Sequence, residues 1–302
     1  MNKYSKLVLV LATLVLGAFQ TSCLRLDSNL YNPEPVEEYK LDEYEGNTEI
    51  LLDAKYDVDY SDVHLFTLQS QGPDEASATT IWAMYIGDTT RIATDTIIMY
   101  CHGNARNMDS YYQRTKLLAN LGHKHRFGVM TIDYRGYGMS EGYSTEDGLY
   151  ADVDEALKWL KSKGLTDDRL VMYGFSMGTA PATELTANPR SMQPSKLILE
   201  APFASVDVMI HDAGLLANKA SFFTDLKIDN AEEIKKVEEP FLWTHGTVDD
   251  FLAYDTHGEV VFKNYNGTYS RALPVEGAGH SDLPFILGYE TYIEEMLKFM
   301  ER

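Results

Sequence analysis

Residues 170–180 read Leu-Val-Met-Tyr-Gly-Phe-Ser-Met-Gly-Thr-Ala. An apolar run typical of a buried strand leads directly into the pattern Gly-x-Ser-x-Gly at residues 174–178, and the residues that follow can wind into a helix. Strand, sharp turn and helix together form a nucleophile elbow, in which the serine is strained and both glycines permit close backbone contact. The sequence therefore predicts Ser176 as a nucleophile and the backbone N–H of Met177 as an oxyanion donor.

The same pattern occurs a second time, at residues 138–142, with Ser140 at its centre. Residues 134–137 separate this pattern from the preceding apolar run, and Tyr143 rather than a helix follows it. Because an elbow needs a strand directly before the turn and a helix directly after it, the sequence favours Ser176 as the nucleophile. Ser140 is expected to lie in a glycine-rich loop.

Apolar runs alternate with longer amphipathic segments in the C-terminal two thirds of the chain. The runs lie at residues 96–101, 128–133, 170–173, 196–200, 240–245 and 271–275. Strands that alternate with helices form βαβ crossovers, so the sequence predicts an α/β fold with a mostly parallel central sheet and helices on both faces. The clearest helix spans residues 145–163, with Ser144 and Asp147 expected at its cap, and a closing helix is expected at 284–302.

The N-terminal part of the chain has a different pattern. Runs rich in β-forming residues at 54–60, 63–69 and 79–86 are expected as antiparallel strands at one edge of the sheet. We expect residues 50–302 to form one domain. Residues 23–49, which carry prolines and many acidic side chains without sustained periodicity, are expected as a tether or loosely packed arm.

Residues 205–237 separate two of the predicted strands without strict periodicity. Long insertions of this kind are usually functional or disordered. The segment is interpreted either as a short cap inserted over the site or as a longer helical crossover.

Carboxylates and a histidine follow the last predicted strands in the order that a Ser–acid–His triad needs in this kind of sheet. Asp249 and Asp250 end the stretch Trp-Thr-His-Gly-Thr-Val-Asp-Asp after one strand, and His280 ends Gly-Ala-Gly-His after the next. Open α/β sheets place their sites at these strand ends. We expect His280 to accept the serine proton and Asp249 to orient its imidazole, with Asp250 and Glu200 as alternatives for the acid. His257 is expected in a helix, without a catalytic role.

The loop after the run 96–101 reads His-Gly-Asn-Ala. Its glycine permits a tight turn, and a loop at this place supplies the second oxyanion donor beside an elbow. We expect that donor to be the backbone N–H of Asn104, with Ala105 as the alternative, and we expect His102 to shape the loop.

The composition excludes several classes of protein. Of 302 residues, 44% are hydrophobic, which argues against intrinsic disorder. With 26 Lys and Arg against 46 Asp and Glu, the net charge of −20 has the wrong sign for binding a phosphate backbone, so no nucleic-acid partner is expected. The two cysteines, Cys23 and Cys101, lie in unlike contexts and are not expected to pair. No metal motif or dinucleotide fingerprint occurs, so no cofactor is expected.

The N-terminus has the pattern of a targeting segment. Lys3 and Lys6 precede 13 largely apolar residues at 7–19, which as a helix would span only about 20 Å of a hydrocarbon core of about 30 Å. Residues 1–22 are therefore expected as a cleaved signal peptide. Thr-Ser-Cys at 21–23 resembles the lipobox of bacterial lipoproteins, although Gln20 departs from it, and this resemblance implies an exported protein acylated and membrane-anchored at Cys23. An unlipidated secretory protein is the alternative.

Taken together, five motifs in this order resemble the α/β-hydrolase superfamily, and within it the esterase and serine-aminopeptidase-like branch. The resemblance covers residues 94–302, and its motifs lie at 102–104, 133–140, 174–178, 245–249 and 277–280. It implies acyl hydrolysis without metal or cofactor, on carboxylic esters, thioesters, lipids or peptides.

The expected activity is therefore hydrolysis of a carboxylic-ester-type bond in a small-molecule or lipid acyl substrate, through an acyl-enzyme on Ser176. Two alternatives remain open. The chain could be a serine peptidase that cleaves amides, or a catalytically silent binding lipoprotein on the same fold, since a fold alone does not establish activity.

Overall fold

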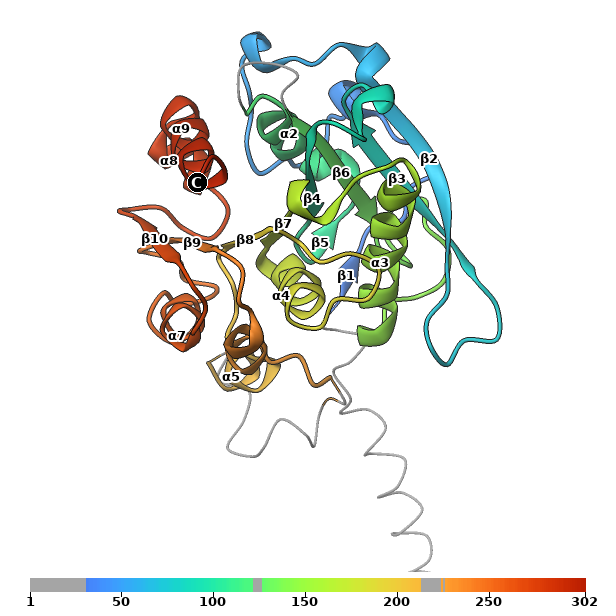
Figure 1. Ribbon diagram of the computed structural model, residues 1–302. Helices are drawn as coiled ribbons and strands as arrows, with labels where there is room; N and C mark the ends of the chain where they lie inside the picture. The colour runs from blue at the N-terminus through green and yellow to red at the C-terminus, as the bar shows by residue number, and fades with distance from the viewer. Residues whose placement is uncertain (1–30, 122–126, 213–223, 225) are drawn as a thin grey trace, which may run out of the picture.

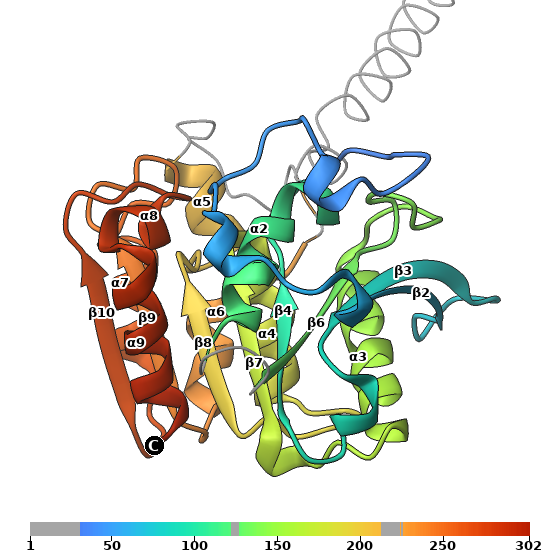
Figure 2. The same cartoon turned by 90° about the horizontal axis from the view of Figure 1, so that it is seen from above.

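The computed structural model describes residues 31–121, 127–212, 224 and 226–302, and in these residues eight strands form one sheet (Figure 1). Its strand order is β10-β9-β8-β7-β4-β6-β3-β2, with β10 and β2 at opposite edges (Figure 2). The strands are β2 (Val63–Ser70), β3 (Thr79–Ile86), β4 (Thr96–Cys101), β6 (Phe127–Asp133), β7 (Leu170–Phe175), β8 (Lys196–Glu200), β9 (Phe241–Gly246) and β10 (Ser270–Val275). Strand β3 pairs antiparallel with β2 and β6, and the other pairings in this sheet are parallel. The fold class predicted from the sequence is confirmed.

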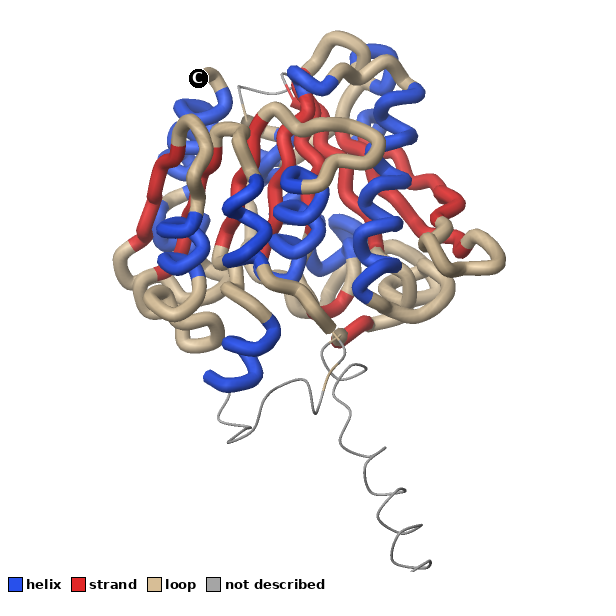
Figure 3. Tube along the Cα trace, turned by 60° about the horizontal axis from the view of Figure 1, so that its bottom comes forward, coloured by secondary structure: helices blue, strands red, loops and turns tan. Residues whose placement is uncertain are grey.

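Helices cover both faces of the sheet, which explains why the central strands are apolar and buried along almost their whole length. The helices are α2 (Met108–Ala119), α3 (Glu146–Ser162), α4 (Thr179–Ala187), α5 (Val206–Asp212), α6 (Asn230–Glu233), α7 (Gly258–Asn264), α8 (Leu283–Leu287) and α9 (Tyr289–Met300). Helices α2 and α9 pack on one face, and α3, α4 and α7 on the other (Figures 1 and 3). Each face buries its own apolar cluster, with Leu157 and Val261 in one and Leu117 and Met296 in the other.

The run at residues 54–60 is not a strand, so this part of the prediction was wrong. Its ends form two short 3₁₀ turns, Ala54–Tyr56 and Tyr60–Asp62. The side chain of Asp59 accepts a hydrogen bond from the backbone N–H of Ser61, and this local bond favours a turn over a strand. Tyr56 is buried by the turn rather than by strand pairing.

Two helix ends also differ from the prediction. Thr145, not Ser144, caps α3, because its hydroxyl accepts the hydrogen bond from the N–H of Gly148, whereas the Ser144 hydroxyl donates to the carbonyl of Arg135. The closing helix is broken into α8 and α9 at Gly288, whose φ of +85° interrupts the helical backbone.

Residues 31–49 pack on the domain rather than forming a loose arm. A short strand β1 (Asn32–Pro33) pairs in parallel with β5 (Ala105–Arg106), just beyond the end of β4. The Asp109 carboxylate accepts hydrogen bonds from the backbone N–H groups of Lys40 and Leu41, and Leu41 is buried. Because these contacts are made by backbone groups, they impose no periodicity on the side chains. The sequence pattern therefore did not reveal that this segment packs on the domain.

The segment at residues 205–237, expected as a cap or a crossover, contains α5 and α6 in its described parts. Its residues 213–223 and 225 lie outside the described residues. The two ends of the segment meet, since Ser205 and Asp229 form a β-bridge and the N–H of Val206 donates to the carbonyl of Ile228 at 3.0 Å.

The serine of the second Gly-x-Ser-x-Gly pattern links two strands. The buried Ser140 hydroxyl donates to the Asp133 carbonyl at 2.6 Å and accepts from the Trp82 N–H at 2.8 Å. It therefore joins the end of β6 to β3, in the glycine-rich loop that the sequence predicts.

We expect Ser140→Ala to lower the free energy of unfolding by about 1–3 kcal/mol, because it leaves a backbone donor and a backbone acceptor without their partner. Urea titration measures this loss, with the exposed Ser61→Ala as the control variant. The hydrolysis expected from the sequence should be unchanged in folded Ser140→Ala. Lost hydrolysis at unchanged stability would instead assign Ser140 to the chemistry.

Candidate active site

Ser176 lies at the carboxyl end of β7, where the chain turns sharply into α4. Its φ of +52° is in the left-handed region, and it opens a 3₁₀ turn, Ser176–Gly178. A Cβ on Gly174 would lie 2.6 Å from the carbonyl oxygen of Gly178, and one on Gly178 would overlap the carbonyl oxygen of Cys101. Only glycine fits at either position, so the two glycines allow the turn that places the buried Ser176 at the carboxyl edge of the sheet.

The three side chains predicted as nucleophile, base and acid lie in one hydrogen-bonded chain. The Ser176 Oγ is 2.9 Å from His280 Nε2, and His280 Nδ1 is 2.8 Å from Asp249 Oδ2. An ionised carboxylate can only accept, so Nδ1 carries the proton and Nε2 is free to accept from the serine hydroxyl. Asp249 follows β9 and His280 follows β10, at the strand ends that the sequence indicates.

Asp249 is held in its ionised form by its surroundings. Its Oδ1 accepts hydrogen bonds from the N–H groups of Phe251 and Leu252, at 2.9 and 2.8 Å. Burial acts to raise the pKa of Asp249, but the hydrogen bonds from His245 and His280 outweigh it and hold that pKa well below its usual range. The carboxylate is therefore charged throughout the neutral range.

His245 is a second histidine beside Asp249, and the sequence analysis gave it no role. The indole N–H of Trp243 can only donate, and it lies 3.4 Å from His245 Nδ1, so Nε2 carries the proton. Nε2 lies 2.9 Å from the Leu252 carbonyl and 3.2 Å from Asp249 Oδ2. Its position four residues before the acid, at the end of a buried strand, is the sequence signal that could have revealed it.

The other candidates for acid and base lie elsewhere. Asp250 is exposed, and Glu200 accepts a hydrogen bond from Arg114 at 2.7 Å. His257 is buried and accepts a hydrogen bond from the N–H of Ala204, and burial lowers its pKa. Among the carboxylates considered as the acid, Asp249 is therefore the one that the structure places in hydrogen-bond contact with His280.

The loop expected to hold the second oxyanion donor lies beside the elbow, because β4 pairs directly with β7. The Asn104 side-chain oxygen accepts hydrogen bonds from the Tyr137 hydroxyl at 2.7 Å and from the Asn32 N–H at 2.9 Å. The Tyr137 hydroxyl also lies 3.8 Å from the sulfur of Met177. The two residues predicted as oxyanion donors, Asn104 and Met177, are therefore linked through Tyr137, and their roles stay predictions.

The loop carries a strained residue at its end. Arg106 has a φ of +72°, which costs free energy for a residue with a side chain. The N–H of Glu34 donates to the Arg106 carbonyl at 3.2 Å, and β1 pairs with β5 at this residue. The arm of residues 31–49 therefore helps to hold the loop in its strained form.

His102 packs within an aromatic cluster behind the loop, stacked on Tyr111 with ring centroids 4.8 Å apart. Its Nε2 lies 3.2 Å from the buried carboxylate of Asp133, and the Tyr134 hydroxyl donates to its carbonyl. These contacts agree with the expectation that His102 shapes the loop.

In the described part of the chain, residues 31–121, 127–212, 224 and 226–302, no group of three or more His, Cys, Asp or Glu side chains is placed to hold a metal ion. Nor does that part of the chain contain a helix long and apolar enough to cross a membrane. Cys101 is a buried free thiol whose pKa is raised by burial, while Cys23 and the predicted signal peptide 1–22 lie outside the described residues.

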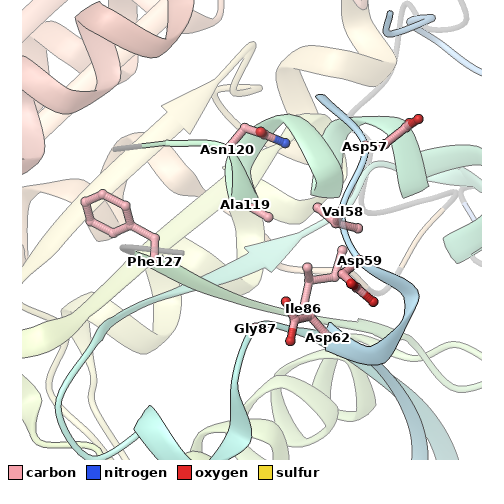
Figure 4. A pocket seen from close by; sticks show the side chains of 9 residues that line it. All are labelled: Asp57, Val58, Asp59, Asp62, Ile86, Gly87, Ala119, Asn120 and Phe127. Atoms are coloured by element: carbon pink, nitrogen blue, oxygen red, sulfur yellow. The ribbon is translucent and has the colours of Figure 1, made fainter. Parts of the chain in front are cut away.

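A cavity of about 350 Å³ lies at the amino ends of the parallel strands, and its lining includes none of the candidate catalytic residues (Figure 4). Asp57, Asp62, Gly87, Asn120 and Phe127 are among the residues that line it. None of the predicted catalytic residues reaches it, so the cavity is separate from the site at the carboxyl edge.

Known proteins of similar sequence provide evidence on the family of the chain that is independent of the site geometry. A sequence model of the family described as "alpha/beta hydrolase fold" matches residues 96–260. The chain is 31% identical over 207 residues to human alpha/beta hydrolase domain-containing protein 17B, covering 68% of this chain and 66% of that protein. It is 29% identical over 205 residues to mouse alpha/beta hydrolase domain-containing protein 17C, covering 67% and 59% respectively. The chain thus spans 66% and 59% of the length of these two relatives, less than two thirds of each.

Solved structures show the same fold. An esterase from Pyrococcus furiosus superposes with a TM-score of 0.66 at 16% identity, over 90% of this chain and 98% of that one. An esterase from Exiguobacterium antarcticum superposes with a TM-score of 0.57 at 22% identity, over 78% of this chain and all of that one (100%). At these identities the similarity concerns the fold alone.

The lowered pKa of Asp249 predicts a pH-dependent contribution to stability. A carboxyl group with a depressed folded pKa stabilises fully above its unfolded pKa of about 3.9 and loses this contribution as the pH falls toward the folded value. The difference in unfolding free energy between the wild type and Asp249→Asn should therefore be larger at about pH 5 than at about pH 3, and it should shrink as the pH falls below about 4. Urea titrations across this range measure it, with the exposed Asp250→Asn as control. A difference that stays constant down to the acid transition would contradict the prediction.

Proposed function

Because the chain belongs to the alpha/beta hydrolase family, we propose that it is a serine hydrolase that cleaves carboxylic esters through an acyl-enzyme on Ser176. The observation that carries this proposal is the hydrogen-bonded chain from Ser176 through His280 to Asp249, with distances of 2.9 and 2.8 Å. A nucleophile, a base within reach of it and an acid that orients the base are the three parts that such chemistry requires.

In the first half of the reaction, His280 Nε2 takes the hydroxyl proton as Ser176 Oγ bonds to the carbonyl carbon of the ester. The carbonyl oxygen becomes an oxyanion and accepts hydrogen bonds from the backbone N–H groups of Met177 and Asn104. The charged Asp249 stabilises the imidazolium. When the oxyanion collapses, the bond to the leaving alcohol breaks and His280 returns the proton to that oxygen.

In the second half, a water molecule gives its proton to His280 Nε2 and attacks the acyl carbon. The bond to Ser176 Oγ then breaks, His280 reprotonates that oxygen, and the carboxylic acid leaves. The cycle uses one water and restores every group, so these residues suffice for it without a cofactor.

Exposed apolar side chains lie beside His280, and we call them the apolar rim. They support the proposal that the preferred substrate carries an apolar acyl group. We define this rim as Val248 and Phe251, two exposed apolar side chains in the loop after β9, where the Val248 N–H donates to the carbonyl of Ala278, two residues before His280. The Phe251 ring meets the His280 ring edge-on, with centroids 5.0 Å apart. Because exposed apolar side chains beside a candidate site can bind apolar parts of a substrate, the proposed substrate is a small-molecule or lipid ester with an aliphatic acyl chain.

A panel of p-nitrophenyl esters of increasing acyl length, run beside aminoacyl-anilides, tests the proposal. We expect ester hydrolysis whose kcat/KM rises with acyl length as the chain covers the apolar rim, and much slower cleavage of the anilides, because an amide needs a protonated leaving nitrogen. Ser176→Ala and His280→Ala should each lower kcat by about 10³-fold or more.

Ser140→Ala, the other serine in the same sequence pattern, is the matched control for this panel and should keep the wild-type kcat. Faster anilide cleavage would assign the chain to the peptidase class. Wild-type protein that is folded but cleaves no member of the panel and reacts with no fluorophosphonate would favour the silent binding protein.

We also propose that the mature chain is exported and anchored to a membrane by acylation of Cys23. The support is the apolar run at residues 7–19 followed by Thr-Ser-Cys. Tyr31 is eight positions after Cys23, so the chain between them reaches at most about 29 Å before it docks at β1 beside the Asn104 loop. An anchor at Cys23 would therefore keep the site close to the lipid surface.

Expression of the full chain in a bacterial host with labelled palmitate tests this anchor. We expect label in the wild type and in Cys101→Ala but none in Cys23→Ala, which should move to the soluble fraction, because acyl chains stabilise the membrane-bound form by about 0.8 kcal/mol per buried CH₂. Wild-type protein without label, beside a labelled lipoprotein control, would contradict the anchor and leave the hydrolase proposal intact.

A further inference from the structure

Arg114 on α2 is a buried cation, with 3% of its side chain exposed, that bonds to three separate parts of the chain. Its Nε donates to Glu49 in the N-terminal arm at 2.6 Å, and its Nη1 donates to Glu200 at the end of β8 at 2.7 Å. Its Nη2 donates to the backbone carbonyl of Ser281 at 2.7 Å. Ser281 is the residue directly after His280, so one side of the guanidinium holds the histidine loop.

The same guanidinium also contacts the elbow. It lies over the ring of Phe175, with its central carbon 4.2 Å from the ring centroid, and Phe175 directly precedes Ser176. The Phe175 ring in turn lies beside the His280 ring, with centroids 5.4 Å apart. Arg114 therefore contacts the neighbours in sequence of both the proposed nucleophile and the proposed base, while touching neither of them itself.

The histidine loop needs support on this side. Gly277, with a φ of +76°, and Gly279 precede His280, and glycines leave the backbone free to adopt other conformations. Before His280, Gly277 and Ala278 bond to the loop after β9, through the Thr247 hydroxyl and the Val248 N–H, each at 3.0 Å. The Gly279 N–H donates to the Asp282 carboxylate within the histidine loop at 2.7 Å. The bond from Arg114 holds the loop after His280, so the imidazole lies between two anchored points.

The carboxylates keep the guanidinium in this orientation. Glu49 and Glu200 bind two edges of its planar fork, and the second oxygen of Glu200 accepts hydrogen bonds from the hydroxyls of Tyr173 and Tyr292. A planar fork of donors can bind three acceptors in fixed directions, which a lysine ammonium on a flexible stem cannot reproduce.

We propose that Arg114 is a positioning residue that holds His280 Nε2 at hydrogen-bond distance from Ser176 Oγ through the Ser281 carbonyl and the Phe175 ring. This inference rests on the proposed function and extends it to a residue that touches neither substrate nor reacting atoms. By the same inference Glu49, which lies in the arm before the predicted domain, helps to hold the Arg114 guanidinium in place.

Arg114→Lys is the first test, because it keeps the charge and removes the fork. We expect kcat for the best ester of the panel to fall by about 10²-fold with KM within about twofold, since an imidazole displaced by about 1 Å still permits substrate binding but not proton transfer. Arg135→Lys is the matched control. Arg135 is equally buried and pairs with Asp152 and Glu75, away from the histidine loop, so its loss should lower stability without lowering kcat.

A double-mutant comparison separates positioning from general destabilisation. In a His280→Ala background, Arg114→Lys should cause no further loss of residual hydrolysis, because its effect passes through His280. Glu49→Gln keeps an acceptor for Arg114 and should fold, with a smaller loss of kcat in the same direction. A further loss of the full size in the His280→Ala background, or equal kcat losses in Arg114→Lys and Arg135→Lys, would overturn the inference.

Crystal structures of the variants give a readout that does not depend on turnover. Arg114→Lys, or Glu49→Gln if the lysine variant does not fold, should show His280 Nε2 beyond hydrogen-bond distance from Ser176 Oγ, and Arg135→Lys should keep the 2.9 Å contact. An undisplaced imidazole would refute positioning by Arg114 even in an active enzyme. Wild-type protein that cleaves no ester would refute the proposed function instead, and the imidazole position would still decide the role of Arg114.

Discussion

The close backbone contact between the elbow and the end of β4 is the constraint on which the site depends. Gly178 lies against the carbonyl of Cys101 and Gly174 against the carbonyl of Gly178, and a side chain at either position would push the turn away from the sheet. The contact lets Ser176 keep its φ of +52° and brings the Asn104 loop beside it. The proposed nucleophile and the proposed oxyanion donors are thus arranged by one packing requirement between neighbouring strands.

The remaining side chains of the site are held by polar groups buried behind it. His245 and two backbone N–H groups hold Asp249, while Arg114 holds the loop of His280 with help from Glu49 and Glu200. Each of these buried charged groups has a hydrogen-bonding partner, because an unpaired charge removed from water costs free energy. The chemistry we propose therefore depends on residues from the arm, α2, β8 and β9 as well as on the three that the motifs name.

The structure could be predicted from the sequence wherever its geometry depends on a strict local pattern of residues. Parallel strands that are buried on both faces appear in the sequence as continuous apolar runs, so the sheet could be predicted from them. The elbow needs a glycine on each side of its serine, so the position of Ser176 in the turn could be predicted as well. Order along the chain predicted Asp249 and His280 as acid and base, and the structure places the two side chains in hydrogen-bond contact. Arg114 and Glu49 were missed because nothing local marks an arginine on a buried helix face whose partners lie 65 and 167 residues away. The docked arm was missed for a related reason, since backbone bonds carry it.

Reaction of the folded protein with a fluorophosphonate, followed by peptide mass spectrometry, tests most directly whether Ser176 is activated by His280. A single phosphonyl group on the peptide that contains Ser176, with a reaction rate that falls about 10³-fold in His280→Ala, is the result that the account predicts. Label on Ser140 or another serine, or labelling of Ser176 at an equal rate without His280, would contradict it.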